Sequence, residues 1–529
     1  GSLLNGQNYA LWVDTDGDSV VDTKLQDGVA SQSSQVTFDK LAGGGYLIPA
    51  EQTVIFEVHS NIAASLTNDD LLLKFDTGSS VTYLEAEQAD DGSNLSGITT
   101  NGTCNATTCD IIVTMTRSKL WSLVSQGSLF VTKDTVSVRS HQLLGGTLGD
   151  PILRLQFRAQ NEDIDITDIQ FNSSGSTATS IDRLELYRDG DTVPFATAST
   201  GGCGTDDTLA TNNGHAGAAI VAFCAKMQSH QFVVKPGDPN NKILVRPRLN
   251  SDDQGATSNQ VIQLWLTKQA ISNSTSGSGA VRARGALSSN DLVANGGDTT
   301  ANGEIFIGTD TATTNSDVVG NVNKSVLAKI VSITDVNPDS ALNNGNPNVP
   351  VGTSGFAQFK FTAATNTNSL NGLNKFTLSG VIFNVNATNV TLSPSLFKIY
   401  NRNDASTKVT CVSRYSADGI AIGSSGTASG SFLVDCQGLK GSTISTSINS
   451  GDSAIFVLEG NIINSKVGTA NSALQGSIQN FTSLTNATGY ASNSSTKNQM
   501  EWLDEDTATT IFYWLEYQGT EVKSTSYKS

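Results

Sequence analysis

An acidic segment near the N-terminus is the first group of side chains whose types and spacing could do chemistry. Asp14, Asp16, Asp18 and Asp22 fall at positions 1, 3, 5 and 9 of one loop. Carboxylates at these positions resemble the ligands of EF-hand-like and thrombospondin-type calcium loops, because Ca²⁺ prefers oxygen ligands. The match is incomplete, since Leu25 occupies position 12, where a bidentate Glu is expected. Two interpretations stay open: a calcium site, which would be the chain's one cofactor, and an acidic hairpin turn.

Catalytic motifs are scarce. Phe75–Gly78 matches the Asp-Thr-Gly motif of pepsin-like aspartic proteases. Those enzymes need a second such loop, so that one carboxyl is protonated while its neighbour is charged. The sequence contains no second copy, and His59, His141, His215 and His230 lack metal-ligand spacing. We therefore expect a protein that is not an enzyme.

The six cysteines fall into three pairs of near neighbours in the sequence. The pairs are Cys104 with Cys109, Cys203 with Cys224, and Cys411 with Cys436. An even number of cysteines in local pairs predicts three short-range disulfides and an oxidising compartment.

Asn-X-Ser/Thr sequons are dense, and each is a candidate glycosylation site in a secreted protein. They begin at Asn94, Asn101, Asn105, Asn172, Asn273, Asn323, Asn386, Asn389, Asn480, Asn486 and Asn493. Many such matches arise by chance in a chain this rich in Asn, Ser and Thr. They are usable only if the source organism N-glycosylates its proteins.

One repeated element organises these groups. Ser180–Ala196 has apolar and polar residues in alternation on both sides of Asp189-Gly190-Asp191, which predicts two strands joined by a tight turn. The same pattern occurs at Ala10–Thr23 and at Ser395–Cys411. Three copies of one hairpin indicate a repeated module.

Each hairpin is followed by segments in the same order, but the strands that precede it recur in only two copies. The matching segments after the hairpin include Glu51–Ile62, Asn240–Asn250 and Gly451–Ile462. Ile152–Gln160 and Phe356–Ala364 open the second and third modules. The chain reaches its first hairpin by Ala10 without such an opening. We therefore expect the first sandwich to lack one or two strands.

The predicted fold is all-β, with tandem Ig-like β-sandwich modules of which the first is incomplete at its N-terminus. The predicted modules are residues 1–137, 138–323 and 324–529. A hydrophobic content of 37% and a charged content of 15% are low, and Ser, Thr, Asn and Gly make up the difference. This composition is typical of extracellular β-sandwiches with many short strands and polar loops.

Charge and hydropathy limit the partners. The net charge is −17, from 32 basic and 49 acidic residues, and no basic patch alternates with aromatic residues. Nucleic acid is therefore not an expected partner. No apolar run approaches the length of a membrane span, so we expect none.

The most aromatic stretch is Ile511–Tyr517 near the C-terminus. Phe512, Trp514 and Tyr517 are candidates for a contact with the next subunit, formed by adding a strand to an open sheet edge. The alternative is a central strand packed inside the third module.

The chain resembles the large secreted surface-layer-like proteins of the cell envelope of ultrasmall candidate-phylum bacteria. The segments that carry the resemblance are ILRLQFRAQNEDIDITDIQF, STATSIDRLELYRDGDTVPFA, ILVRP, SGAVRARG, FKFTAA, SGVIFNVNATNV and VKSTSY. The resemblance implies a self-assembling coat, sheath or filament. It transfers no functional residue to this chain.

The sequence thus favours a structural subunit of a self-assembling extracellular surface layer, sheath or filament at the cell surface. Its partners would be copies of itself, joined by strand or edge contacts, and cell-envelope glycans are a further candidate. One alternative is a secreted adhesin or glycan-binding protein, which exposed aromatic residues in a groove would favour. Another is a secreted hydrolase, which would need two carboxylates at catalytic spacing in a cleft.

Overall fold

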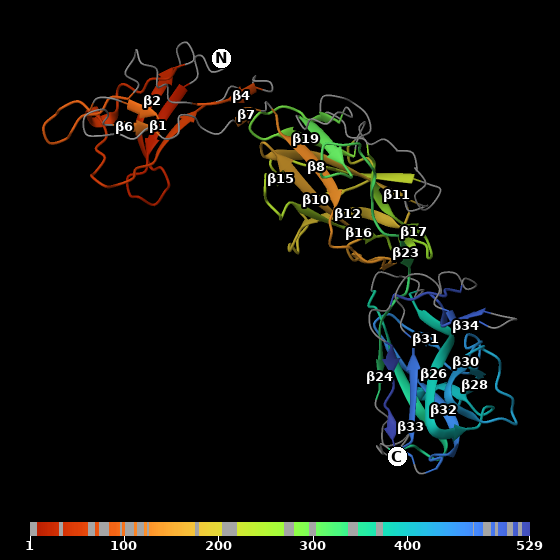
Figure 1. Cartoon of the computed structure of the whole chain (residues 1–529). Coiled ribbons are helices and arrows are strands. Elements are labelled where there is room, and N and C mark those ends of the chain that lie inside the picture. Colours follow the sequence, from red (N-terminus) through yellow and green to blue (C-terminus); the bar gives the residue numbers. More distant parts are fainter. Residues whose placement is uncertain are drawn as a thin grey trace.

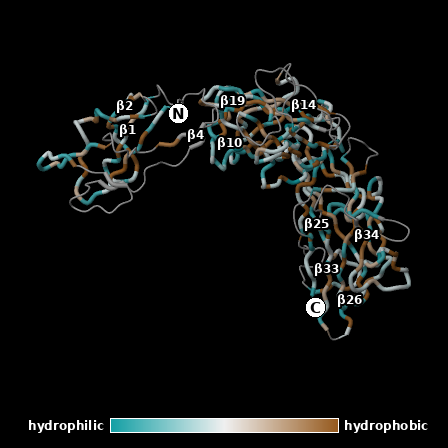
Figure 2. The backbone as a smooth tube through the Cα atoms, turned by 45° about the horizontal axis from the view of Figure 1, so that its top comes forward, coloured by the Kyte–Doolittle hydropathy of each residue, from teal (hydrophilic) through white to brown (hydrophobic). Residues whose placement is uncertain are grey.

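The computed structural model shows a chain built almost wholly of β-strands, with short 3₁₀ turns. It describes residues 8–528 except 31–34, 62–68, 74–83, 96–97, 101–110, 114–120, 124–125, 175–178, 204–219, 269–279, 296–302, 337–347, 367–373, 469, 480–487, 492–495, 505–510 and 517–520. Three lobes follow one another along the chain (Figure 1), and a second view shows the same three lobes (Figure 2). We call them modules one, two and three, with described residues 8–123, 126–326 and 330–528. The all-β prediction is confirmed.

Module one contains a three-stranded antiparallel sheet in the order β2-β1-β3. Its elements are β1 (Asn8–Val13), β2 (Thr23–Ala30), η1 (Ala42–Gly44), β3 (Phe56–Ser60), β4 (Asp69–Leu71), β5 (Ile98–Thr100), β6 (Ile111–Val113) and β7 (Trp121–Leu123). β4 pairs with β7, and β5 pairs with β6. The predicted first hairpin is confirmed, because β1 and β2 pair across the acidic turn.

Module two is a sandwich of a seven-stranded sheet, in the order β13-β12-β16-β10-β8-β21-β20, and a six-stranded sheet built around β11. Its elements are β8 (Ser128–Lys133), β9 (Gln142–Leu144), β10 (Leu153–Gln160), β11 (Ile164–Ser174), β12 (Ile181–Arg188), β13 (Ala196–Ala198), β14 (Ile220–Lys226), β15 (Val233–Val234), β16 (Lys242–Leu249), η3 (Asp252–Gln254), β17 (Val261–Ile262), β18 (Leu264–Leu266), β19 (Val281–Gly285), β20 (Val293–Ala294), β21 (Glu304–Ile307), β22 (Val318–Val319) and β23 (Asn323–Val326). Alternate residues of the central strands, such as Leu153, Leu155 and Phe157 of β10, meet those of β11 in one hydrophobic core.

Module three has one continuous set of strands, because the 17-residue strand β26 pairs with strands of both layers. Its elements are β24 (Ile330–Asp335), β25 (Gly352–Ala363), β26 (Phe376–Leu392), β27 (Lys398–Asn401), η4 (Arg402–Asp404), β28 (Val409–Thr410), β29 (Val412–Tyr415), β30 (Ala428–Cys436), β31 (Ser447–Ile448), β32 (Ser453–Asn464), β33 (Ala473–Ile478), β34 (Thr488–Ala491), β35 (Thr496–Asn498), β36 (Met500–Leu503), β37 (Val522–Lys523) and β38 (Tyr527–Lys528). Its buried residues form a second core, to which Leu144 and Val326 of module two also contribute.

The boundary between modules one and two differs from the prediction. β8 lies within the predicted first module, but it pairs with β10 and β21 in the sheet of module two. Its residues Leu129 and Val131 are buried in the core of module two. Residues 127–146 and 303–322 are similar in sequence, but β8 and β21 are neighbours in one sheet rather than closing strands of successive modules.

The boundary between modules two and three lies close to the predicted one. β23 begins at Asn323 and pairs with β9 and β17 of module two, and β24 is the first strand of module three. Among the described residues, no helix has the length and hydropathy needed to cross a bilayer.

Candidate functional site

The repeated hairpin allows the same positions to be compared in three sheets. Val13 of β1 pairs with Phe56, and Leu186 of β12 pairs with Val245. Asn401 of β27 pairs with Phe456. Val13, Leu186 and Asn401 each stand three residues before an Asp of the hairpin turn. β3, β16 and β32 are therefore equivalent strands.

Modules two and three add further strands beyond this position. β16 pairs on its second edge with β10, which pairs with β8. β32 pairs on its second edge with β25, which pairs with β24. In module one, by contrast, β3 is the last strand of its sheet among the described residues. The predicted lack of an opening strand in module one stays a prediction, because residues 1–7 and several later segments of this module lie outside the described residues.

Apolar side chains of β3 are exposed, whereas their equivalents in module three are buried. Phe56 is 39% exposed and Val58 is 40% exposed, whereas Phe456 and Leu458, their equivalents in β32, are 0% exposed. Tyr46 gives Phe56 one edge-on ring contact, at 5.4 Å between centroids. The difference is one of position, since Phe56 and Phe456 are the same residue type in equivalent strands.

The backbone of β3 also points donors and acceptors outward. Asp14 donates to the carbonyl of Ile55 (3.0 Å), and Asn61 donates to the carbonyl of Asn8 (3.3 Å). Odd-numbered residues of β3 therefore bond to β1. Because bonding direction alternates along an antiparallel strand, the N–H and C=O groups of Phe56 and Val58 face the opposite edge.

The acidic loop brings together three of the four predicted calcium ligands. Asp14, Asp16 and Asp18 each offer a carboxylate oxygen within 4.8 Å of the others. Asp14 already accepts hydrogen bonds from the N–H groups of Gly17 (2.8 Å) and Ser19 (2.9 Å). Gly17 lies at φ 81°, which a residue without Cβ adopts at little cost. The loop thus provides hard oxygen ligands of the kind that Ca²⁺ uses.

Asp22 is directed away from this group. Its carboxylate accepts a 2.8 Å hydrogen bond from the Thr15 hydroxyl and a second bond from the Thr15 N–H (3.2 Å). These bonds lower the pKa of Asp22. The structure therefore supports Asp14, Asp16 and Asp18 as a set, and it gives Asp22 another partner.

Two of the three predicted disulfides are confirmed. Cys203 is bonded to Cys224, and Cys411 is bonded to Cys436. In both modules the first cysteine follows the second hairpin strand, and its partner lies on a strand of the opposite layer, β14 or β30. Cys104 and Cys109 lie outside the described residues.

The sequons divide into three groups. Asn94 and Asn386 are exposed and Asn389 is half-buried, and these three stay predictions. Asn172 and Asn323 are fully buried, so glycosylation of the folded chain at these two sites is a wrong prediction. The other sequons lie outside the described residues, at Asn101, Asn105, Asn273, Asn480, Asn486 and Asn493.

The aromatic C-terminal stretch packs inside module three. Phe512 and Trp514 are buried, and both rings contact Trp502. The Trp502 indole donates a 2.7 Å hydrogen bond to the carbonyl of Trp514. Phe512 and Trp514 are therefore core residues, and their prediction as subunit contacts is wrong. Tyr517 lies outside the described residues.

A buried polar cluster joins modules two and three, and no sequence motif indicates it. Oε1 of Glu516 lies 2.6 Å from Nδ1 of His141, and Oε2 accepts a 2.6 Å bond from the N–H of Gln142. Lys329 forms a 2.9 Å ion pair with the same carboxylate. Burial would raise the pKa of Glu516, but the His141 hydrogen bond and the Lys329 charge lower it to about 2. His141 and Glu516 are 375 residues apart in the chain, so no local pattern could have paired them.

Further contacts extend this junction. The carboxylate of Asp504 accepts a hydrogen bond from the hydroxyl of Ser258 and a 3.0 Å bond from the N–H of Leu327. The Asn366 amide donates to the carbonyl of Gly145 at 2.7 Å. Hydrogen bonds therefore connect module three to module two. Those that involve a carboxylate are charge-assisted and are stronger than hydrogen bonds between neutral groups.

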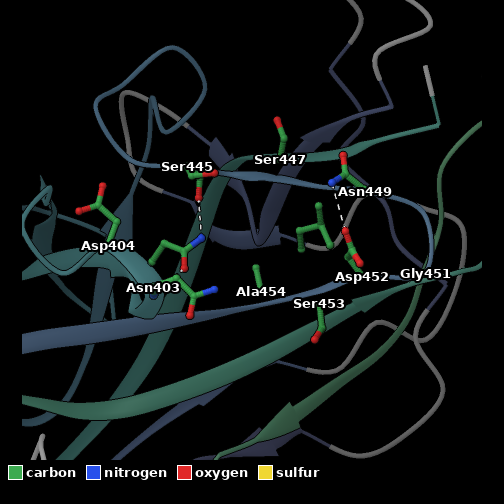
Figure 3. Close-up of a pocket in the computed structure, with 11 residues that line it drawn as sticks. Asn403, Asp404, Ser445, Ser447, Asn449, Gly451, Asp452, Ser453 and Ala454 are labelled. Atoms are coloured by element: carbon green, nitrogen blue, oxygen red, sulfur yellow. Dashed lines mark hydrogen bonds between the residues drawn. The ribbon is translucent and has the colours of Figure 1, made fainter. Parts of the chain in front are cut away.

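Module three also contains an open polar hollow of about 450 Å³ (Figure 3). Its walls include Asn403, Asp404 and Asp452, and hydrogen bonds fix Asn401 to the Ser445 carbonyl (3.0 Å) and Asn449 to Asp452 (3.1 Å). None of the residues that line it is aromatic. Stacking of a sugar ring on an aromatic face, as expected for a glycan-binding groove, therefore has no basis in this hollow.

Comparisons with known proteins identify no family. No family model matches the chain, and no curated protein matches it significantly. Among solved structures, the C-terminal domain of the antigen I/II polypeptide BspA of Streptococcus agalactiae aligns with 76% of this chain and 99% of that one, at 9% identity and a TM-score of 0.16. The C-terminal domain of AspA of Streptococcus pyogenes aligns with 76% and 98%, at 10% identity and a TM-score of 0.16. A lectin of Pleurotus ostreatus aligns with 76% and 93%, at 10% identity and a TM-score of 0.11. Likenesses at these TM-scores support no conclusion about fold or function.

Proposed function

We propose that this chain is a structural subunit of an extracellular surface layer, sheath or filament whose subunits join through β-strand contacts. The observation that carries the proposal is the open sheet of module one. Among the described residues this sheet stops at β3 and leaves backbone donors and acceptors at its edge, and unpaired edges promote association with another chain. The resemblance of the sequence to surface-layer-like envelope proteins points to the same role.

Two features support an extracellular, load-bearing protein. The disulfides Cys203–Cys224 and Cys411–Cys436 favour an oxidising compartment. The buried cluster around Glu516 holds modules two and three together, which suits a subunit that acts as a stiff spacer. The proposal assigns no catalytic residue, and it gives calcium bound at Asp14, Asp16 and Asp18 the role of stiffening module one.

Electron microscopy of the purified chain and of the native cell envelope tests this function, with and without chelator. We expect a regular layer, sheath or filament that antibodies against the chain label along its length. A chain that stays monomeric in every condition, and that is scattered as single molecules in the envelope, would contradict the proposal.

A further inference from the structure

The strand position next to β3 has two occupied equivalents within this chain. β10 and β25 both run antiparallel to the strand that corresponds to β3. In module two, Gly149 and Ile152 donate hydrogen bonds to the carbonyls of Pro247 (2.8 Å) and Val245 (3.0 Å). Pro247 and Val245 correspond to Val58 and Phe56, so the outward-facing carbonyls of β3 are the ones that accept bonds in module two.

β25 lies along the equivalent of the whole of β3, whereas β10 pairs only with the equivalents of residues 53–56, so β25 is the template for the full edge and β10 for its beginning. β10 alternates buried apolar residues, Leu153, Leu155 and Phe157, with Arg154 and Arg158. β25 carries Phe359 and Phe361 on either side of Lys360. An occupant of the same pattern would cover Phe56 and Val58 with its apolar face and complete the backbone ladder with its edge.

The negative charge of module one favours a basic strand beside β3. Residues 1–126 contain 16 acidic and 5 basic side chains. A strand with Arg or Lys at its outward positions would approach this acidic module along a favourable potential. An acidic strand would be repelled.

β10 and β25 are already paired within their own modules. β10 is paired with β16 and β8, and β25 is paired with β32 and β24, so each has a partner on both edges. A second copy could supply either strand only by dismantling its own module. The occupant is therefore expected to come from a different polypeptide.

We infer that the free edge of β3 takes up an extended segment of a separate protein, apolar at alternate positions and basic at the positions between them. The segment pairs antiparallel with Phe56–Ser60 and buries Phe56 and Val58. This inference goes beyond the proposed function, since it assigns the edge of β3 to a second kind of subunit in the assembly and leaves contacts between copies of this chain to other edges.

Fluorescence anisotropy with the full chain tests the inference, using as the probe a labelled peptide of the sequence of residues 352–363, GTSGFAQFKFTA, because these residues pair with the equivalents of Phe56 and Val58 in module three. A peptide of the same composition, reordered so that apolar residues no longer alternate, is the control. We expect the first peptide to bind at least ten times more tightly than the second. Equal binding of both peptides, or binding of neither, would overturn the inference.

Chain variants locate the binding. The double variant F56K/V58K should weaken binding at least tenfold, whereas V20K, which alters an exposed valine elsewhere in module one, should leave it within about twofold. Hydrogen exchange of modules one to three confirms that each variant folds. Loss of binding in V20K but not in F56K/V58K would place the site elsewhere and overturn the inference.

Backbone-methylated peptides distinguish strand addition from nonspecific hydrophobic contact. N-methylation at alternate residues removes the donors along one edge of a strand, so one of the two possible methylated peptides should lose binding and the other should keep it. Equal behaviour of both would contradict strand pairing.

If F56K/V58K instead changes the oligomeric state of the chain alone, the occupant is a second copy and the inference of a separate protein fails. Because polymers in the envelope are scored independently, failure of the peptide to bind leaves the proposed function testable on its own terms.

Discussion

Module one and module three present the same hairpin and the same following strand in opposite situations. In module three, β32 lies between β27 and β25, and Phe456 is fully buried. In module one, β3 has β1 on one side, and Phe56 is 39% exposed. Hydrophobic sequence alone therefore does not decide burial; the number of strands in the sheet decides whether the same residue type becomes core or surface.

The largest expected effect comes from truncating the two equivalent phenylalanines. F456A removes a fully buried ring and should destabilise module three by about 3–5 kcal/mol. F56A should cost less than about 1 kcal/mol, because its ring is already in contact with water. Hydrogen exchange resolved by module measures both values, which a single global unfolding curve would mix. Similar losses in both variants would show that the two strands are equally enclosed.

The junction offers a second contrast, between a buried carboxylate and an exposed one. E516Q removes the nearer of two carboxylates beside His141 and Lys329, leaving Asp150 at 3.6 and 3.9 Å, and should destabilise the contact between modules two and three by about 3 kcal/mol. D182N removes a carboxylate 2.6 Å from Arg183 at the surface and should have almost no effect. X-ray scattering should show a wider range of angles between the modules only for E516Q. An unchanged scattering profile for E516Q would contradict the role of the cluster.

Acid should loosen the same junction. The pKa of Glu516 is about 2 in the folded chain and near its usual value of 4.5 when unfolded. A lowered folded pKa contributes stability that is fully present above pH 4.5 and is lost as the pH falls toward 2, about 3 kcal/mol in total. Denaturant titrations of the wild type and E516Q across this window measure the difference. The two curves should converge at the acid end; parallel curves would argue against this assignment.

Removing a disulfide should destabilise only the module in which it links the hairpin to the opposite layer. C411S/C436S opens a loop with a sequence separation of 25 and should destabilise module three by about 3 kcal/mol. Hydrogen exchange should show the loss in β27 and β30 and leave module one unchanged. A comparable loss in module one would mean that the modules do not unfold separately.

The smallest expected effect is from calcium. At a concentration ten times its dissociation constant, Ca²⁺ bound to the acidic loop would stabilise module one by on the order of 1 kcal/mol. D16N should abolish this gain. The equivalent turn in module two has Tyr187 in place of Asp14 and uses Asp189 to bind Arg154, so module two should not respond. Stabilisation of module two by Ca²⁺ would show that the effect is not specific to the loop.

Local pattern was enough to predict the all-β fold, the three hairpins and the two described disulfides. The turn Asp189-Gly190-Asp191 and its counterparts signal the hairpins, since glycine at φ 86° at Gly190 favours the tight turn. Local pattern did not predict which strands pair when they are distant in the sequence. β8 falls within the predicted first module, but it pairs with β21 and β10 of module two, which are distant from it in the sequence.

For the same reason, the sequence predicted only part of the candidate site. The acidic loop is visible in a stretch of adjacent residues. Burial of Asn172, Asn323 and Phe512 depends on the layers that fold over them, which a sequon or an aromatic run does not encode. The contact of His141 with Glu516 needs residues from two modules, so it becomes visible only in three dimensions.

The order of His141 and Glu516 along the chain has a consequence for biogenesis. A ribosome makes His141 and Gln142 long before it makes the carboxylate that they bind, and domains generally fold as they emerge. The bonds of Glu516 to module two therefore form only after residue 516 has left the ribosome, so module two has to fold without them.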